Sequence, residues 1–372
     1  MERAEPKEGL PVDTDNTNWR LYTNSVEAWE AMLSSISSAT KSIFLEEYIL
    51  ASDQIGKRFI DLLIQKAREG LEVKVICDDV GSYNFSRSKD PERLRAAGVL
   101  LKFFNPLLPW EPAQETFWYF RNHRKILIVD DTKVFIGSIC LADQMEHWRE
   151  TTVSLCAPHI IHQMKKTFFA TWNKDYKRIS YYRGKKDAST PLADFDYMTN
   201  APLPRKRFIY YELLRQVQKA QNQICITTPY FLPNRRLQRA LFSALRRGVN
   251  IKILLPRKSD TPFVDAGART FFESFLKRGT EIYLYEKMIH AKTVVIDSAW
   301  STLGSMNLDN LSLRYNFEGN IVSRNPLFNM QMKNQFVSDL EKSNLLSLSS
   351  FKKRPLKDKF LEFLAYPIRS FL

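Results

Sequence analysis

NHRKILIVD at residues 122–130 and IHAKTVVID at residues 289–297 share one pattern, His-x-Lys-x4-Asp. In both stretches the histidine and lysine lead into a run of aliphatic and β-branched residues, which predicts a buried strand. A pattern of this length that returns with matched flanks is far from accidental. The chain is therefore expected to contain two copies of one structural unit.

The segments before each motif also repeat, in the order helix, strand, helix, strand. Hydrophobic periodicity and glycines after the second helix of each copy define these elements. The expected elements are Val26–Ser37, Ser42–Leu50, Gly56–Arg68 and Glu72–Cys77 in the first copy, and Phe208–Ala220, Gln223–Thr228, Arg236–Arg247 and Asn250–Leu255 in the second. This alternation predicts an α/β fold with a mainly parallel or mixed sheet in each half. Two similar halves are expected to pack about a pseudo-twofold axis, which brings equivalent positions together.

A length of 372 residues favours two domains rather than one. A stretch rich in Lys, Arg and Pro with little periodicity separates the copies and predicts a linker. The expected divisions are an N-terminal extension at 1–17, a first domain at 18–182, a linker at 183–206, a second domain at 207–348 and a basic amphipathic tail at 349–372.

The net charge of +14 indicates an anionic partner, either nucleic acid or an acidic membrane surface. No uninterrupted apolar stretch of roughly 18 residues is present, so a transmembrane anchor is not expected. Residues 1–16 have no apolar core of a signal peptide, and the four cysteines have no CxxC spacing. These features predict an intracellular protein with reduced thiols, and charge alone does not choose between the two anionic partners.

The two motifs carry the candidate chemistry. On a strand, residues two apart share a face, so His123 is expected to project with Lys125, and His290 with Lys292. The aspartates of the motifs, at an odd offset of seven, should face the other way. We therefore interpret Asp130 and Asp297 as structural supports within the catalytic motifs.

Each motif is followed by Gly-Ser and then by an acid, Glu150 in the first copy and Glu318 in the second. A carboxylate bonded to the far ring nitrogen would fix the tautomer of a histidine and stabilise its cation. Two histidines and two lysines supply a nucleophile, an acid and phosphate-binding cations without metal or cofactor. Lys125, Lys292 and Asn307 are the expected phosphate ligands.

These residues resemble the phospholipase D superfamily and, within it, the bacterial cardiolipin synthases, over residues 18–343. The segments typical of the synthases are DDVGS at 78–82, TPYFLP at 228–233, KSD at 258–260, GSMNLD at 304–309 and NFE at 316–318. The resemblance implies two tandem α/β/α sandwich domains with mixed sheets. It also implies transfer of a phosphatidyl group between two phosphatidylglycerols through a phosphatidyl-histidine, with release of glycerol.

The chain departs from the family where Cys140 stands in the position that usually holds asparagine after the first motif, which removes one amide from that half-site. The resemblance to synthases without transmembrane helices implies peripheral contact with the cytoplasmic side of the cell membrane, and two segments are candidates for this contact. One is the tail, whose apolar residues Leu356, Phe360, Phe363 and Leu364 share a helical stripe, and the other is the aromatic connection from Asn105 to Phe120. Docking onto the protein's own core is the alternative for each.

The leading hypothesis is thus a phosphatidyltransferase of cardiolipin-synthase type acting on an anionic phospholipid, with one chain sufficient for one active site. A phospholipase D hydrolase that releases phosphatidic acid is the second candidate. A nuclease or other phosphodiesterase ranks third, since no track of stacking aromatics is evident and no nucleic-acid partner is expected. A binding module that lost catalysis is the candidate from another class.

Overall fold

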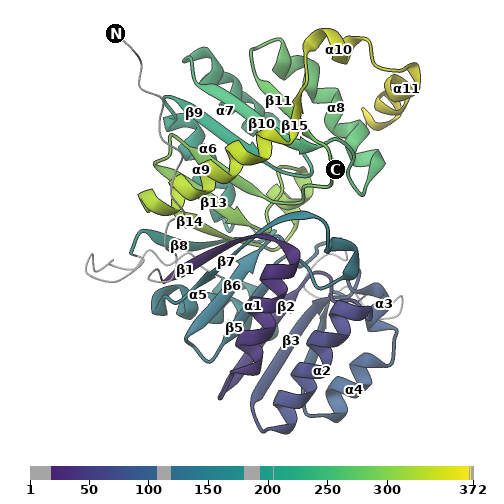
Figure 1. Ribbon diagram of the computed structural model, residues 1–372, viewed down its shortest axis with the longest axis vertical. Helices are drawn as coiled ribbons and strands as arrows, with labels where there is room; N and C mark the ends of the chain where they lie inside the picture. The colour runs from purple at the N-terminus through teal and green to yellow at the C-terminus, as the bar shows by residue number, and fades with distance from the viewer. Residues whose placement is uncertain (1–17, 107–118, 180–192, 204, 368, 370–372) are drawn as a thin grey trace.

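The computed structural model describes residues 18–106, 119–179, 193–203, 205–367 and 369. Two mixed sheets form the centres of two α/β halves, which lie one above the other in Figure 1. The predicted α/β architecture of two related halves is confirmed.

The first sheet has seven strands in the order β1-β7-β6-β5-β2-β3-β4. Only β2, β3 and β4 run parallel to one another, while β5, β6, β7 and β1 follow in antiparallel pairs. The strands are β1 (Trp19–Asn24), β2 (Ser42–Glu47), β3 (Glu72–Asp78), β4 (Leu100–Phe104), β5 (Ile126–Val129), β6 (Lys133–Gly137) and β7 (Arg149–Leu155). The helices are α1 (Ser25–Ser37), α2 (Gln54–Arg68), α3 (Tyr83–Ser86), α4 (Asp90–Ala96) and α5 (Pro158–Trp172), with short 3-10 turns at η2 (Asp143–Met145) and η3 (Tyr176–Arg178).

The second sheet repeats this plan with one added edge strand, in the order β15-β11-β10-β9-β12-β13-β14-β8. Its strands are β8 (Phe195–Asn200), β9 (Gln223–Thr227), β10 (Asn250–Pro256), β11 (Glu281–Tyr285), β12 (Thr293–Ile296), β13 (Trp300–Gly304), β14 (Glu318–Ser323) and β15 (Ser343–Leu345). Its helices are α6 (Phe208–Lys219), α7 (Arg235–Arg246), α8 (Pro262–Leu276), α9 (Pro326–Glu341), α10 (Leu348–Lys352) and α11 (Leu356–Ala365), with a π-helical turn at η4 (Leu311–Tyr315).

Local sequence accounts for the element boundaries. Helix α2 begins after Asp53, whose carboxylate accepts a hydrogen bond from the N–H of Gly56, and its chain reverses at Gly70 with φ of +93°. All eight elements predicted from the repeat are present, with ends that differ by at most three residues. The largest difference is in β2, the first of the predicted strands, which ends at Glu47 rather than Leu50.

The interval 183–206, predicted as a linker, contains part of the second fold. Strand β8 lies within it and pairs antiparallel with β14 from Glu318↔Asn200 to Ser323↔Phe195. All six residues of β8 are buried, so the second sheet begins before residue 207. Because β8 is buried on both faces, its sequence has no sustained alternation of apolar and polar residues that would predict a strand. Residues 1–17 and 183–192 lie outside the described residues.

The two halves are joined by a shared hydrophobic core and by reciprocal backbone pairing. One cluster of buried side chains contains β5, β6 and β7 residues together with β13 and β14 residues. At its edge Asn122 pairs with Phe317, and Arg149 pairs with Ile289. Because each bridge joins a segment before a motif histidine to a segment before a glutamate of the other half, the arrangement is the one that a pseudo-twofold axis requires.

Candidate active site

The motif histidines lie in the segments that lead into β5 and β12, not on the strands themselves. Strand β5 begins at Ile126 and β12 at Thr293, so each histidine and lysine precedes the regular ladder. The expected strand was too long because these residues pair across the halves instead. The N–H of His123 donates to the Phe317 carbonyl at 2.9 Å, and the N–H of His290 donates to the Arg149 carbonyl at 2.9 Å.

Each histidine is held by the glutamate of the opposite half. Nδ1 of His123 lies 3.1 Å from both carboxylate oxygens of Glu318. Nδ1 of His290 lies 2.6 Å from Oε1 of Glu150. With Nδ1 donating its hydrogen to a carboxylate, Nε2 is left as the reactive nitrogen of each ring. The spacing in the sequence pointed to these glutamates but did not reveal the exchange between halves.

Both glutamates are positioned by the serine of the recurring Gly-Ser pair. The hydroxyl of Ser138 donates to Glu150 and that of Ser305 donates to Glu318, and all four side chains are buried. The glycine before each serine allows this approach. A Cβ at Gly137 would lie 2.4 Å from the Thr151 carbonyl oxygen. One at Gly304 would lie 2.3 Å from the Gly319 carbonyl oxygen, so glycine is required at both places.

Burial and mutual attraction set the charge states of these pairs. Burial lowers the pKa of His123 to about 4, against the opposing attraction of Glu318. Burial also lowers the pKa of His290. Burial alone would raise the pKa of Glu150 and Glu318, but the facing histidines, their hydrogen bonds and the nearby lysines outweigh it and hold both values below the usual range. These directions favour charged carboxylates and neutral imidazoles in the resting site.

The two lysines lie between the halves. Lys125 donates to the His123 carbonyl at 2.7 Å, and Lys292 donates to the His290 carbonyl at 2.8 Å. Burial lowers the pKa of Lys292 to about 7, and repulsion from Lys125 adds to this. Lys292 also lowers the pKa of His123, and Lys125 that of His290, so the four side chains lie within electrostatic reach of one another.

The motif aspartates bind backbone rather than the imidazoles. Asp130 has φ of +51° and accepts hydrogen bonds from the N–H groups of Thr40, Lys41 and Ser42, at the entry to β2. Asp297, with φ of +52°, accepts from the N–H groups of residues 221–223 at the entry to β9. Each aspartate thus ties the end of the motif strand to the start of its neighbour.

The half-sites differ at the residue two places after the serine. In the second half this is Asn307, which is buried, hydrogen-bonds Asp309 and has an Oδ1 atom without a partner within the described ranges. Burial raises the pKa of Asp309 to about 7. In the first half it is Cys140, also buried, and burial raises the pKa of its thiol to about 12. The thiol is therefore neutral and supplies no amide.

An aromatic ring lies against each histidine, and no pattern in the sequence predicted either contact. Tyr48 contacts His123 edge to face with ring centroids 4.8 Å apart, and Trp148 contacts His290 at 5.3 Å. Both rings come from the first half. Of the predicted aromatic connection, residues 107–118 lie outside the described residues.

The C-terminal tail forms helices α10 and α11 on the second half, beside α8 (Figure 1). Helix α11 buries Glu362 and Ala365, and Glu362 pairs with Arg354. Its predicted apolar stripe faces outward, since Leu356 is 80% exposed, Phe360 61% and Phe363 74%. No helix among the described residues has the length and hydropathy to span a bilayer.

Two α/β halves that exchange carboxylates around paired His-x-Lys motifs define a phospholipase D-like enzyme. The family described as cardiolipin synthase, PLD-like domain, matches residues 32–172 and 213–340. The chain belongs to this cardiolipin synthase family.

Curated relatives agree along most of the chain. It is 33% identical over 360 residues to the cardiolipin synthase of Clostridium perfringens strain 13, covering 92% of this chain and 74% of the relative. It is 30% identical to the major cardiolipin synthase ClsA of Bacillus subtilis strain 168, covering 93% and 73%. Among solved structures, the phosphatidylserine synthase of Haemophilus influenzae Rd KW20 has a similar fold, with a TM-score of 0.73 at 15% identity over 94% and 92% of the two chains.

Proposed function

We propose that the protein is a phosphatidyltransferase that joins two phosphatidylglycerols to give cardiolipin and glycerol. The crossed pairs His123–Glu318 and His290–Glu150, with a lysine beside each histidine, carry this proposal. They present two imidazole Nε2 atoms and two cations to one phosphodiester. The proposed substrate class, phospholipids, rests on the family, whereas the proposed reaction mechanism rests on the side chains of the site.

In the first half-reaction, Nε2 of one histidine attacks the phosphorus of phosphatidylglycerol. The P–O bond to the terminal glycerol breaks, and the second histidine, as imidazolium, gives its proton to the departing oxygen. Glycerol leaves and a phosphatidyl-histidine remains. Lys125 and Lys292 stabilise the charge on the equatorial oxygens.

In the second half-reaction, a hydroxyl of another phosphatidylglycerol gives its proton to the now neutral second histidine and attacks the phosphorus. The P–N bond breaks, cardiolipin leaves, and the first histidine is restored. The unpartnered Oδ1 of Asn307 is suited to accept a hydrogen bond from the incoming hydroxyl, while its amide group and the lysines hold the phosphate. In each half-reaction the summed charge of the two imidazole rings stays the same, because one ring gains a positive charge as the other loses it.

We assign the nucleophile to His123 and the acid to His290. The 2.6 Å contact between His290 and Glu150 is shorter than the 3.1 Å contacts of His123, so the cationic form of His290 is better stabilised. A low pKa of about 4 keeps His123 neutral and ready to attack. The approach of an anionic phosphodiester favours protonation of His290 in the complex.

The exposed face of α11 supports peripheral contact with the membrane that contains the lipid. This helix packs against the protein through Glu362 and Ala365 and presents Leu356, Phe360 and Phe363 to the outside. Lys352, Lys353, Lys357 and Lys359 flank the apolar residues, as expected of a helix that lies in an anionic interface. Contact from the cytoplasmic side is part of this proposal.

The test is incubation of the purified full chain with phosphatidylglycerol vesicles, followed by lipid and glycerol analysis. We expect cardiolipin and glycerol in equal amounts. His123→Ala and His290→Ala should each lower turnover by at least about a thousandfold. His162→Ala, at an exposed histidine on α5, is the matched control and should retain activity.

Phosphatidic acid as the sole product would contradict the transferase and establish the hydrolase instead. Full turnover in either catalytic variant would contradict the paired-histidine mechanism. Mass spectrometry of trapped enzyme, with the phosphatidyl group on residue 123 or 290, assigns the nucleophile.

A further inference from the structure

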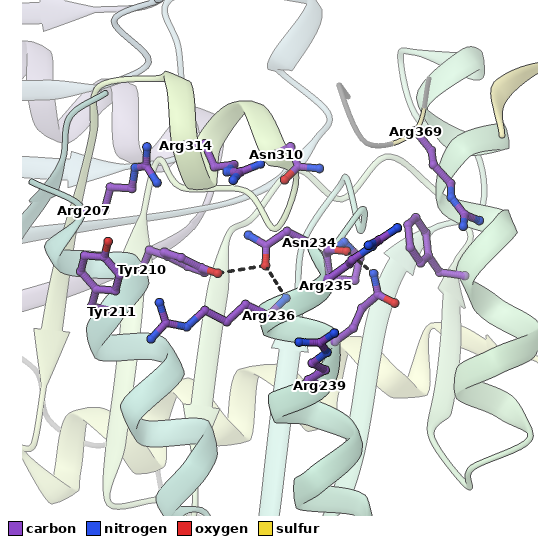
Figure 2. A pocket seen from close by; sticks show the side chains of 13 residues that line it. Arg207, Tyr210, Tyr211, Asn234, Arg235, Arg236, Arg239, Asn310, Arg314 and Arg369 are labelled. Carbon is purple, nitrogen blue, oxygen red and sulfur yellow. Dashed lines mark hydrogen bonds between the residues drawn. The ribbon is translucent and has the colours of Figure 1, made fainter. Parts of the chain in front are cut away.

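A cavity of about 630 Å³ opens in the second half, beside the N-terminus of α7. In Figure 2 the side chains of Arg207 and Arg314 approach from one side and those of Arg236 and Arg239 from α7, around Asn234. The arginines that line it are Arg207, Arg235, Arg236, Arg239, Arg314 and Arg369.

This cluster of positive charge has no counterion among the residues that the structure describes. Among the described residues that line the cavity there is no Asp or Glu, and none of the six arginines forms an ion pair within those ranges. Guanidinium groups gathered at one concave surface repel one another, and a bound anion removes that repulsion. The cavity is therefore complementary to a ligand with more than one negative charge.

In the first half, the place that corresponds to this cavity is the N-terminus of α2. It is filled by the protein's own carboxylates. Asp143 accepts hydrogen bonds from the N–H groups of Gln54 and Ile55, and Asp53 accepts one from Gly56. Glu30 of α1 forms a two-pronged ion pair with Arg58 at 2.7 and 2.9 Å.

Matching registers identify the counterparts in the second half. Ile43 faces Val129 as Ile224 faces Ile296, and Leu50 bridges Leu141 as Phe231 bridges Leu308. By this correspondence the three acids Glu30, Asp53 and Asp143 become Tyr211, Asn234 and Asn310, all of which line the cavity. Likewise Gln54, Ile55 and His147 become Arg235, Arg236 and Arg314. Every one of these six replacements makes the second half more positive.

The cavity lies at the same edge of the sheet as the candidate active site. Helix α7 follows the carboxyl end of β9, and β12, which runs antiparallel to β9, begins at that same edge just after His290 and Lys292. Asn310 is three residues beyond Asn307. None of the motif residues lines the cavity, so it is a neighbour of the reaction centre rather than part of it.

We propose that this arginine cavity binds the phosphate group of an anionic phospholipid headgroup and holds the enzyme on the membrane beside its reaction centre. The planar, five-donor guanidinium group matches phosphate oxygens in paired hydrogen bonds. The N-terminus of α7 adds a favourable dipole where the first half has Asp143. A lipid source is favoured over a free phosphate because Arg369, on the cavity wall, follows α11, whose exposed apolar residues suit the same interface.

The experiment measures binding, in a His123→Ala background, to phosphatidylcholine vesicles with and without phosphatidylglycerol. The double variant Arg236→Gln/Arg239→Gln removes two cavity charges. Its matched control, Arg68→Gln/Arg246→Gln, removes two exposed charges at the far ends of α2 and α7. We expect the cavity variant to bind phosphatidylglycerol vesicles about tenfold more weakly than the control.

A second variant, Asn234→Asp/Asn310→Asp, introduces the acids that stand at the equivalent positions of the first half. It should weaken vesicle binding by a similar factor while keeping its fold, as judged by thermal melting, because the first half already accommodates this arrangement. Equal vesicle binding by the cavity and control variants would overturn the proposal, since it would reduce the effect to overall charge.

Calorimetric titration with inorganic phosphate distinguishes the two sources. Phosphate binding lost in the cavity variant, together with weakened vesicle binding, supports the lipid site. Loss of phosphate binding alone would overturn the lipid assignment in favour of a soluble phosphate. Because binding is measured without turnover, a failure of the synthase activity would leave this result unchanged, and the reverse also holds.

Discussion

The two halves keep the same reaction groups but differ in what surrounds them. Each supplies a histidine, a lysine, a serine and a glutamate in equivalent positions, and each glutamate serves the histidine of the other half. Around this shared centre the first half has Cys140 and an acid-capped α2, whereas the second has Asn307 and an arginine cavity. The side chains of the crossed pairs are thus shared by both copies, while the position after the serine and the N-terminus of the second helix differ between them.

The largest effect is expected at the crossed glutamates. Glu150→Gln and Glu318→Gln should each lower kcat by about a thousandfold, because an amide neither stabilises imidazolium nor fixes the required tautomer. Steady-state kinetics with phosphatidylglycerol vesicles measures this. An exposed acid, Glu146→Gln, is the control. A severe loss in only one of the two variants would break the equivalence of the half-sites.

The comparison predicts unequal roles for Asn307 and Cys140. Asn307→Ala should lower kcat/KM by about a hundredfold, since it removes a donor to the phosphate. Cys140→Ala should change it by less than about threefold, because a buried neutral thiol contributes packing alone. Parallel kinetics of the two variants provides the measurement, and similar losses would show that the first half also contacts substrate through this position.

Lys292 should make turnover sensitive to alkaline pH. Burial lowers its pKa to about 7, so the ammonium needed to bind phosphate is lost as pH rises above that value in the free enzyme. We expect kcat/KM to fall about tenfold per pH unit above pH 7, and kcat to fall only at higher pH because bound phosphate favours the charged lysine. Lys292→Arg should remove this alkaline limb, whereas Lys125→Arg should retain it. An unchanged limb in Lys292→Arg would assign the titration to another group.

The smallest effect is expected at the motif aspartates, on stability rather than on the chemical step. Asp130→Asn and Asp297→Asn each replace a carboxylate that accepts several backbone N–H bonds, at a cost of about 1–3 kcal/mol. The pKa of each carboxyl is held below its usual range, as those backbone bonds outweigh the opposing effect of burial. Their stabilisation is present at neutral pH and is lost as pH falls through the lowered value. Urea unfolding at several pH values tests this, and equal losses at the two positions would support the repeat.

Much of the fold was predictable because each element carries its own signal. Helix α2 (Gln54–Arg68) can be predicted from nearby residues alone, namely its hydrophobic periodicity, the N-cap Asp53 and the turn at Gly70. The same kinds of signal recur around Asn234–Arg246. The family resemblance inferred from the motif flanks was confirmed by the family match. Strand β8 was missed because pairing with β14, rather than local pattern, places it in the sheet.

The candidate site was only partly predictable for the same reason. Spacing predicted functional roles for His123, Glu318 and their counterparts, but the partner of each histidine depends on how the halves pack. The contacts of Tyr48 and Trp148 with the imidazoles likewise arise from tertiary structure. The asymmetry at α7 depends on the strand registers that relate the two sheets, and these registers are a property of the tertiary structure.

The exchange of glutamates between the copies has a consequence for the origin of the chain. A lone half would hold a histidine with no carboxylate to orient it, so a single-copy ancestor of this arrangement would have had to assemble as a pair. With both motifs in one polypeptide, the ratio of the copies is held at one to one. Within one chain the two copies can then differ around their shared centre, as they do at Cys140 and Asn307, without losing either crossed pair.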